Sequence, residues 1–312
     1  MTTITSSGTQ SSGTQSSGTQ SSGTQVRTIG RYKLQHLTQR TLLYLLAALL
    51  TVAFFGPYLW SVFSSLKGPT EIYVFPPTIL PQDPQWGNYL TVWEQVPFAR
   101  FYYNTIIITI FSVIGSVLSS TLVAYGFARF EFPGRDILFM IVIATLILPE
   151  EVTLVPRFIM FRELKWLDTF LPLTVPNFFG TSAFFIFLLR QFMLTMPREL
   201  DEAGEIDGAN SLQILLNILL PSLMPALATL AIFSFLFNWN DFIHPLIYLR
   251  STENYTLSLG LRFFQQAAET GGEPQEPYLM AASLMVTLPP ILLFIFAQRY
   301  FVRGIVLSGI KG

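Results

Sequence analysis

The sequence predicts an all-α membrane protein with six transmembrane helices. Apolar residues make up 51% of its 312 residues and charged residues only 12%, whereas soluble domains usually carry about 25% charged residues. The mean hydropathy is +0.49. The charged residues are also unevenly spaced, and they leave uncharged stretches close to the roughly 20 residues that a spanning helix needs.

Each expected span is one of these stretches. In chain order they are Thr41–Leu66, Phe101–Ala128, Ile137–Pro149, Phe170–Leu189, Gly208–Asn240 and Pro277–Gln298. The third stretch is short and is followed by Glu150 and Glu151, so it must continue toward Pro156 to cross a bilayer. Since the apolar residues are continuous rather than alternating, helices are favoured over a membrane barrel.

The positions of Lys and Arg indicate the orientation. With the N-terminus inside, 11 of the 18 cations lie on the inner side, and four of these directly precede the first span: Arg27, Arg31, Lys33 and Arg40. Cytoplasmic flanks are enriched in Lys and Arg, and the first helix usually dominates the orientation. We therefore expect both termini to be cytoplasmic.

The chain divides into five predicted parts. Residues 1–26 form a tail with four SSGTQ repeats, which predicts disorder because such a composition buries too little apolar surface to fold. Residues 27–66 hold a cytoplasmic lead and the first helix, and residues 67–100 an outer loop with a short helix at Asn88–Gln95. Residues 101–299 form a five-helix core, and residues 300–312 a cytoplasmic tail. Another short helix is expected on the outer surface at Arg157–Asp168.

Several kinds of chemistry are excluded by the composition. The chain has no Cys, and its two His residues, His36 and His244, lie far apart, so we expect no metal site. No phosphate-binding GxxxxGK[ST] loop is present, and a net charge of −1 gives no case for nucleic acid as a partner. Adjacent Glu150 and Glu151 diverge by about 100° on a helix, which makes them a poor acid–base pair.

The inner segment 197–221 is different from the other connections. It holds five carboxylates close together after Pro197, which favours a short helix because acidic groups stabilise a helix N-terminus: Glu199, Asp201, Glu202, Glu205 and Asp207. Gly208 suits a left-handed turn that ends this helix. Either Asn210 or Ser211 can then cap the next helix. An exposed loop that is merely solvated by its acids is an equally good interpretation of the composition.

Two groups of motifs resemble a known family. The letters E-A-G-E-I-D-G-A at Glu202–Ala209, followed by I-L-L-P at Ile218–Pro221, resemble the EAA loop of permease subunits from binding-protein-dependent ABC importers. The family pattern usually has Ala where this chain has Gly204. Because Gly costs about 1 kcal/mol of helix propensity relative to Ala, a looser turn is expected there.

The second group narrows the resemblance. F-N-W-N-D-F-I-H-P-L-I at Phe237–Ile247, Y-T-L-S-L-G-L at Tyr255–Leu261 and the C-terminal R-Y-F-V-R-G-I-V-L-S-G-I-K-G are similar to carbohydrate-uptake permeases related to the maltose transporter. Among these, the chain is similar to the smaller, six-span subunit. The resemblance covers about residues 40–312, which is everything except the repeat tail.

The resemblance implies a type I ABC importer permease fold in a prokaryotic cell membrane. It implies four kinds of partner: a second permease subunit, a dimer of ATP-binding subunits, an extracytoplasmic solute-binding protein and a sugar. ATP would be used by the ATPase, with no cofactor bound by this chain. The implied coupling residues are Glu202, Ala203, Gly204, Asp207, Gly208 and Ala209. Glu202 would accept a hydrogen bond from the ATPase, and Gly208 and Ala209 would allow a close helix approach.

The end of the fifth span is the expected substrate path. Asn238, Trp239, Asn240 and Asp241 form the densest polar cluster at the end of any apolar stretch. Asn238 and Asn240 point about 200° apart on a helix, while Asp241 lies on the side of Asn238. We therefore expect Asn238 and Asp241 to face the path. Alternatively, the two amides satisfy the backbone or neighbouring helices, and Trp239 anchors the membrane interface.

Two other classes of function are weighed against an importer subunit. An ion-coupled secondary transporter of a small polar solute would require ionisable residues in mid-span and usually an internal repeat, and the clean uncharged stretches argue against it. A membrane-bound enzyme would need a clustered polar constellation that the sequence lacks. The resemblance therefore favours a sugar importer permease without a nucleotide site of its own.

Overall fold

The computed structural model describes residues 22–269 and 275–309, and these residues form helices joined by short connections without a strand. The chain divides between Leu59 and Trp60 into two compact units. Helix α1 (Ser22–Ser65) begins in the first unit and ends in the second.

Helix α1 starts inside the last SSGTQ repeat, so the disorder expected for residues 1–26 is wrong for Ser22–Gln25. Residues 1–21 lie outside the described part. Each residue added to an existing helix forms a new hydrogen bond without another nucleation step, which favours this extension.

Among the described residues, five helices are long and apolar enough to cross a membrane: Gln39–Ser65, Phe98–Arg129, Leu171–Leu194, Ser211–Asn240 and Glu276–Gln298. The expected third span does not continue through Pro149. Helix α4 (Arg135–Ala144) and the 3-10 turn η2 (Thr145–Ile147) are followed by α5 (Glu150–Glu163), and the two parts meet at 101°. The reason is local: a residue before proline avoids the helical region, and Leu148 is extended at ψ 121°.

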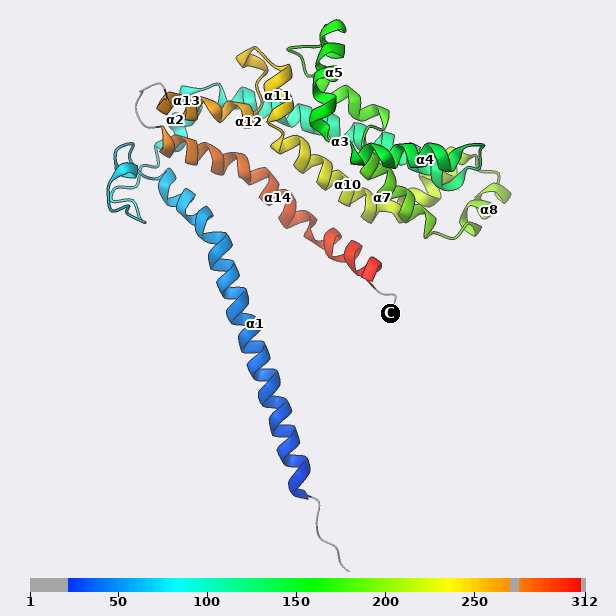
Figure 1. The fold of residues 1–312 in the computed structure, drawn as a ribbon, viewed down its shortest axis with the longest axis horizontal. Coiled ribbons are helices and arrows are strands. Elements are labelled where there is room, and N and C mark those ends of the chain that lie inside the picture. Colours follow the sequence, from blue (N-terminus) through cyan, green and yellow to red (C-terminus); the bar gives the residue numbers. More distant parts are fainter. Residues whose placement is uncertain (1–21, 270–274, 310–312) are drawn as a thin grey trace, which may run out of the picture. The chain divides into compact units, whose positions relative to one another are not determined.

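The second unit is built around α3 (Phe98–Arg129). Figure 1 shows α3 beside α10 (Leu220–Asn240), and α3 also packs on α7 (Ala183–Leu194). Small residues on α3 allow a broken segment, α6 (Leu171–Thr174) and η3 (Val175–Phe179), to approach closely. A Cβ on Gly115 would lie 2.7 Å from the Phe178 ring, and the Ser119 hydroxyl donates to the Asn177 carbonyl at 2.7 Å.

Segment 67–100, the expected outer loop, is part of the second unit. The Asn88 amide donates to the Ser65 and Lys67 carbonyls at 2.8 and 2.9 Å, and the Lys67 ammonium donates to the Thr78 carbonyl. The expected helix Asn88–Gln95 is confirmed as α2. It packs on the last helix, α14 (Glu276–Gly309), which also runs through most of the expected tail 300–312 as one continuous helix.

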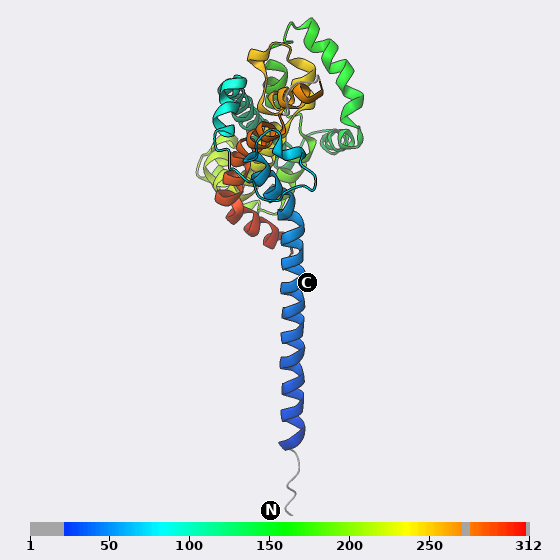
Figure 2. The same cartoon turned by 90° about the vertical axis from the view of Figure 1, so that its left-hand side faces the viewer.

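Short helices complete the unit. They are η1 (Glu71–Tyr73), α8 (Glu199–Ile206), α9 (Ser211–Gln213), the π-helix η4 (Ile214–Leu219), α11 (Ile243–Tyr248), η5 (Thr252–Asn254), α12 (Leu257–Gly260) and α13 (Arg262–Glu269). The helix expected at Arg157–Asp168 lies earlier, as α5. In Figure 1, α8 lies at one end of the unit, and α2 and α13 lie at the other. Figure 2 shows α5, in bright green, at the margin of the unit.

Candidate functional site

The acidic segment forms the predicted helix, turn and second helix. Helix α8 has Glu199, Asp201 and Glu202 in its first turn, where carboxylates interact favourably with the helix dipole. Gly208 follows with φ +80°. The Ala209 amide donates to the Gly204 carbonyl at 2.9 Å, and the Gly208 amide to the Glu205 carbonyl at 3.0 Å. These two bonds form a Schellman motif, which confirms the left-handed turn expected at Gly208.

Asn210, rather than Ser211, caps the next helix. Its side-chain oxygen accepts from the Gln213 amide at 2.9 Å, and the Gln213 side chain accepts from the Asn210 amide at 2.9 Å. This capping box satisfies two backbone donors that a helix start otherwise leaves unpaired. The turn between α8 and α9 is therefore fixed on both sides.

The close helix approach lies at Gly204 and not at Gly208. A Cβ on Gly204 would lie 2.8 Å from Ile218 Cδ1 and 3.0 Å from Ile214 Cγ1, while a Cβ on Gly208 would meet nothing within 4 Å. Gly204 is buried, and Ala209 packs against the core. The departure from Ala at position 204 therefore permits contact between α8 and the π-helix η4, rather than only loosening the turn.

The remaining coupling residues lie on the exposed side of α8 and its turn. Glu202, Ala203, Asp207 and Gly208 are all exposed. Ile206 is 86% exposed, and the motif comparison did not single it out. An exposed large apolar side chain among carboxylates is a feature of protein-binding surfaces. The only signal available in the sequence was an apolar residue inside an acidic run.

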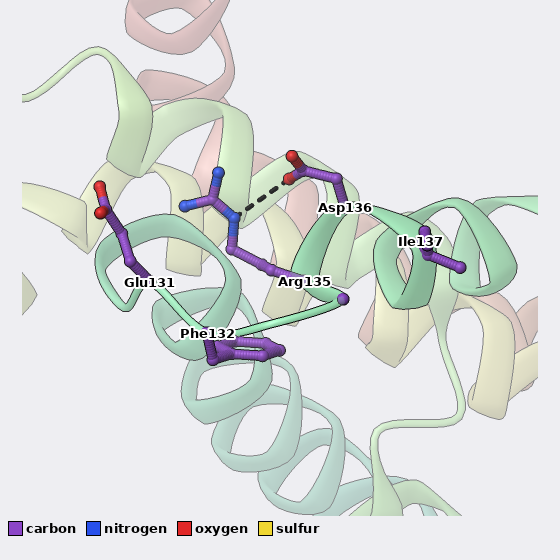
Figure 3. A pocket seen from close by; sticks show the side chains of 6 residues that line it. Glu131, Phe132, Arg135, Asp136 and Ile137 are labelled. Atoms are coloured by element: carbon purple, nitrogen blue, oxygen red, sulfur yellow. Dashed lines mark hydrogen bonds and ion pairs between the residues drawn. The ribbon is translucent and has the colours of Figure 1, made fainter.

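A hollow of about 510 Å³ lies near this segment, at the connection between α3 and α4. Figure 3 shows Arg135 paired with Asp136, and Glu131 on the opposite side of Arg135. Glu131 also forms an ion pair with Arg198, the residue before α8; the Arg198 Nη1 and Glu131 Oε1 atoms lie 3.3 Å apart. The α3–α4 connection and the acidic segment therefore lie at the same end of the unit.

A second, larger cavity of about 610 Å³ lies between α3, α5, α6, α7, α10 and α11. Its polar lining residues are Ser116, Glu150, Arg157, Asn177, Thr181, Ser182, Ser234, Asn238, Asp241, His244 and Tyr248. The remaining lining is apolar and aromatic. A few converging polar groups in an apolar wall are typical of small-molecule sites.

Both residues expected on the substrate path line this cavity. Asn238 and Asp241 are among its lining residues, and Asn240 is not. Each amide also bonds the backbone one turn earlier: Asn238 donates to the Ser234 carbonyl at 2.7 Å, and Asn240 to the Leu236 carbonyl at 2.9 Å. Trp239 is buried, and its indole donates to the Val286 carbonyl at 3.0 Å. It therefore joins α10 to α14 rather than anchoring an interface.

A chain of four ionisable side chains lies along the cavity wall. His244 Nδ1 lies 3.0 Å from Asp241 Oδ2, and His244 Nε2 lies 3.3 Å from Glu150 Oε1. Arg157 Nη1 lies 3.3 Å from the same Glu150 oxygen. The hydrogen bond to Asp241, together with the charges of Asp241 and Glu150, raises the pKa of His244 above its usual 6.5, against the opposing effects of burial and Arg157.

Sequence reasoning missed this network. It set His244 aside because no second His lies near it in the chain, and it treated Glu150 and Glu151 as an adjacent pair. The structure instead places Glu150 on the cavity wall and brings it to His244 across 94 residues of sequence. The break before Pro149 makes this contact possible, because it turns α5 away from the direction of α4. Within the described residues, no group of three His, Asp or Glu side chains is placed to hold a metal ion.

Comparison with known proteins identifies the class. Residues 115–307 match the sequence profile of the family described as "Binding-protein-dependent transport system inner membrane component". The sn-glycerol-3-phosphate transport system permease protein UgpE of Pectobacterium atrosepticum is 33% identical over 242 residues, covering 76% of this chain and 85% of the relative. The arabinooligosaccharides transport system permease protein AraQ of Halalkalibacterium halodurans is 32% identical over 263 residues, covering 82% and 91%.

A solved structure agrees with these relatives. One chain of a bacterial ABC transporter involved in the import of the acidic polysaccharide alginate superposes with a TM-score of 0.73 at 25% identity, covering 86% of this chain and 97% of that one. The fold is thus that of a transporter subunit. The chain belongs to the family of binding-protein-dependent transport system inner membrane components, which are permease subunits of ABC transporters.

Proposed function

We propose that this chain is one of two permease subunits that import a sugar or sugar-like solute across a prokaryotic cell membrane. A dimer of ATP-binding subunits and an extracytoplasmic solute-binding protein complete the transporter. The names of the relatives support this substrate class, because they act on glycerol phosphate, arabinooligosaccharides and alginate. ATP is used by the partner subunit, and this chain binds no cofactor.

In the proposed topology, both termini are cytoplasmic and the chain spans the membrane six times. Six spans are reached when the bent pair of α4 and α5, the third span in chain order, is counted as one crossing. The excess of Lys and Arg at the proposed inner ends supports this orientation. The separation of α8 from α2 and α13 in Figure 1 supports it too, because it puts the acidic segment and the outer connections at opposite ends.

Segment 197–221 is the proposed docking site for the ATPase. The observation that carries this proposal is the two-sided character of α8: its Gly204 side packs on η4, and its other side exposes Glu202, Ala203, Asp207 and Ile206. A helix held on one side and exposed on the other can transmit a movement of its partner to the membrane helices. Glu202 accepts a hydrogen bond from a cationic or polar group of the ATPase, and Ile206 fills an apolar recess.

The cavity beside Asn238 and Asp241 is the proposed part of the substrate path in this subunit. Amide and carboxylate groups hydrogen-bond to sugar hydroxyls, and the Phe184, Phe185 and Phe237 rings in the wall suit the apolar faces of a sugar ring. The charged network of Glu150, Arg157, Asp241 and His244 lies on the same wall. It favours solutes that combine hydroxyl groups with a charge.

Co-expression with candidate partners tests the proposal. We expect a second permease chain and an ATPase to co-purify with this chain, and the ATPase rate to rise when a loaded solute-binding protein is added. The probes are maltose, arabinooligosaccharides, sn-glycerol 3-phosphate and alginate oligosaccharides, each with its binding protein. Uptake that continues without any ATPase subunit and stops with a protonophore would replace this function with ion-coupled secondary transport, for which the His244–carboxylate network is the one favourable observation.

A further inference from the structure

The end of α3 is joined to both sides of the acidic segment. Arg129 is the last residue of α3, and its guanidinium Nη2 lies 3.2 Å from Asp201 Oδ2 in the first turn of α8. Both Arg129 Nη atoms also donate to the Met196 carbonyl at 3.3 Å. One turn earlier on α3, the Tyr125 hydroxyl donates to the carbonyl of Ser211, the first residue of α9, at 3.0 Å.

The Arg129–Asp201 ion pair is protected from water. The Arg129 side chain is 7% exposed and the Asp201 side chain 17% exposed. Removing one partner of a buried ion pair leaves an uncompensated charge, which is far more costly than the loss of an exposed pair. Residues three or four apart lie on the same helix face, so Tyr125 and Arg129 form one continuous contact surface toward α8 and α9.

The exposed Arg198–Glu131 pair at the same end of the unit gives a matched comparison. It also joins the region before α8 to the end of α3, at 3.3 Å, but its side chains are 56% and 75% exposed. Exposed ion pairs of this kind contribute little, typically less than about 1 kcal/mol. Arg129 and Asp201 thus pair α3 with α8 directly, whereas Arg198 and Glu131 pair the residues that flank these helices. The second pair is also far more exposed.

We propose that Arg129 and Asp201 are positioning residues, which fix the ATPase-docking helix α8 to the membrane-spanning helix α3. Movement of α8 is then transmitted directly to α3, around which the second unit is packed. Tyr125 supports the same connection from the α9 side. The inference rests on the proposed function of α8 as the ATPase-docking helix, and it adds the residues that transmit its movement.

The first test measures the connection itself and needs no partner. Because the chain has no Cys, spin labels can be placed at introduced Cys residues on α3 and α8, at the exposed positions Leu122 and Glu205. We expect a single narrow distance distribution for the unaltered chain and a broad one for Arg129→Ala and Asp201→Ala. Arg198→Ala should leave the distribution narrow. An unchanged distribution in Arg129→Ala would overturn the inference.

The second test measures coupling in the assembled transporter, at matched amounts of complex. We expect solute transported per ATP hydrolysed to fall about tenfold in Arg129→Ala, within the usual range of coupling energies, and to be partly restored in Arg129→Lys. The double variant should be no worse than either single variant, because the two residues act as a unit. Additive losses would contradict the inference, and so would a normal amount of solute transported per ATP in a variant whose spin-label distance distribution is broad.

Failure of the unaltered chain to recruit any ATPase would instead refute the proposed function, and the spin-label experiment would still decide the inference.

Discussion

His244 Nδ1 lies 3.0 Å from Asp241 Oδ2, across the corner where α10 ends and α11 begins. On its other side the imidazole reaches Glu150 at the start of α5, so one side chain connects two elements that are far apart in the sequence. The charged and titratable groups that face it are Asp241, Glu150, Arg157 and the Tyr248 ring, whose centroid lies 6.0 Å away. The protonation state of His244 therefore governs how strongly α5 is joined to this corner.

The stability that His244 contributes should depend on pH. Because its pKa in the folded chain is raised above 6.5, its contribution is complete below that value and is lost as the pH rises through the raised pKa. We expect the unaltered chain to have a higher melting temperature than His244→Gln at about pH 6, and this difference to shrink by about pH 9. A constant difference across this range would contradict the prediction.

The two amides at the end of α10 should differ in their effect on transport. Asn238 lines the cavity, and Asn240 does not, while both make the same type of bond to the backbone one turn earlier. Asn240→Ala is therefore a matched control for the loss of that bond. We expect Asn238→Ala to reduce uptake and solute-stimulated ATPase activity about tenfold, close to the value of one or two lost hydrogen bonds. A stronger defect from Asn240→Ala, with both complexes intact, would reverse the assignment.

Local signals made much of this fold predictable. The uncharged stretches predicted six spans, and five of them are unbroken apolar helices among the described residues. Gly208 marked the left-handed turn, and the helix Asn88–Gln95 was predicted to the residue. These features depend on residues close together in the chain. The orientation depends on the surrounding membrane and the roles of the coupling residues on a partner subunit, so both stay predictions.

What could not be predicted depends on contacts between distant residues. The Glu150–His244 pair forms only because the chain breaks before Pro149 and α11 returns to the same wall. Gly204 was interpreted by helix propensity alone, although Ile214 and Ile218 approach it from the following helix. The Arg129–Asp201 pair had no signal in the sequence, because the two residues lie 72 positions apart.

The turn at Gly208 should be essential for coupling. Its φ of +80° is unfavourable for other residues, at a cost of about 1–2 kcal/mol, so Gly208→Val should displace α8 and lower transport per ATP while the chain stays in the membrane. Gly208→Asn is the matched variant, since Asn tolerates this conformation, and it should retain most activity. Glu202→Lys should weaken ATPase co-purification without altering the turn. Normal uptake by Gly208→Val and Glu202→Lys, with the complex intact, would remove this loop from the mechanism.

The repeat tail should be dispensable for transport. The first three SSGTQ repeats, residues 6–20, carry no charge and no apolar side chain, so their composition offers no apolar surface for stable packing. We expect deletion of residues 2–21 to leave the membrane level of the chain and its transport rate within about twofold of normal, a change below about 0.5 kcal/mol. Scrambling the same residues is the control for length. A large loss from both deletion and scrambling would show that a partner recognises the repeat sequence, and a large loss from deletion alone would show that transport requires the length of the tail.

Asp168 should stabilise the connection between α5 and the segment after α11. Its backbone is left-handed at φ 61°, and its carboxylate accepts from the Arg250 and Ser251 amides at 2.9 Å each and from the Ser251 hydroxyl at 2.5 Å. Burial acts in the opposite direction, but these bonds, together with the Asn254 amide, lower the pKa of Asp168 from 3.8 to about 2.

The stabilising effect of Asp168 should therefore be complete above about pH 4 and be lost as the pH falls through 2. At neutral pH, Asp168→Ala should lower the free energy of unfolding by about 1–2 kcal/mol, a value reduced for the solvent exposure of the group. Asp168→Asn keeps one acceptor oxygen and should lose less. Ser251→Ala, which removes only the hydroxyl donor, should lie between Asp168→Asn and the unaltered chain. Thermal unfolding in detergent measures this series. If Asp168→Ala is as stable as the unaltered chain at neutral pH, the segment is held instead by its apolar contacts, in which Tyr248 and Leu249 pack against Phe161 and Leu173.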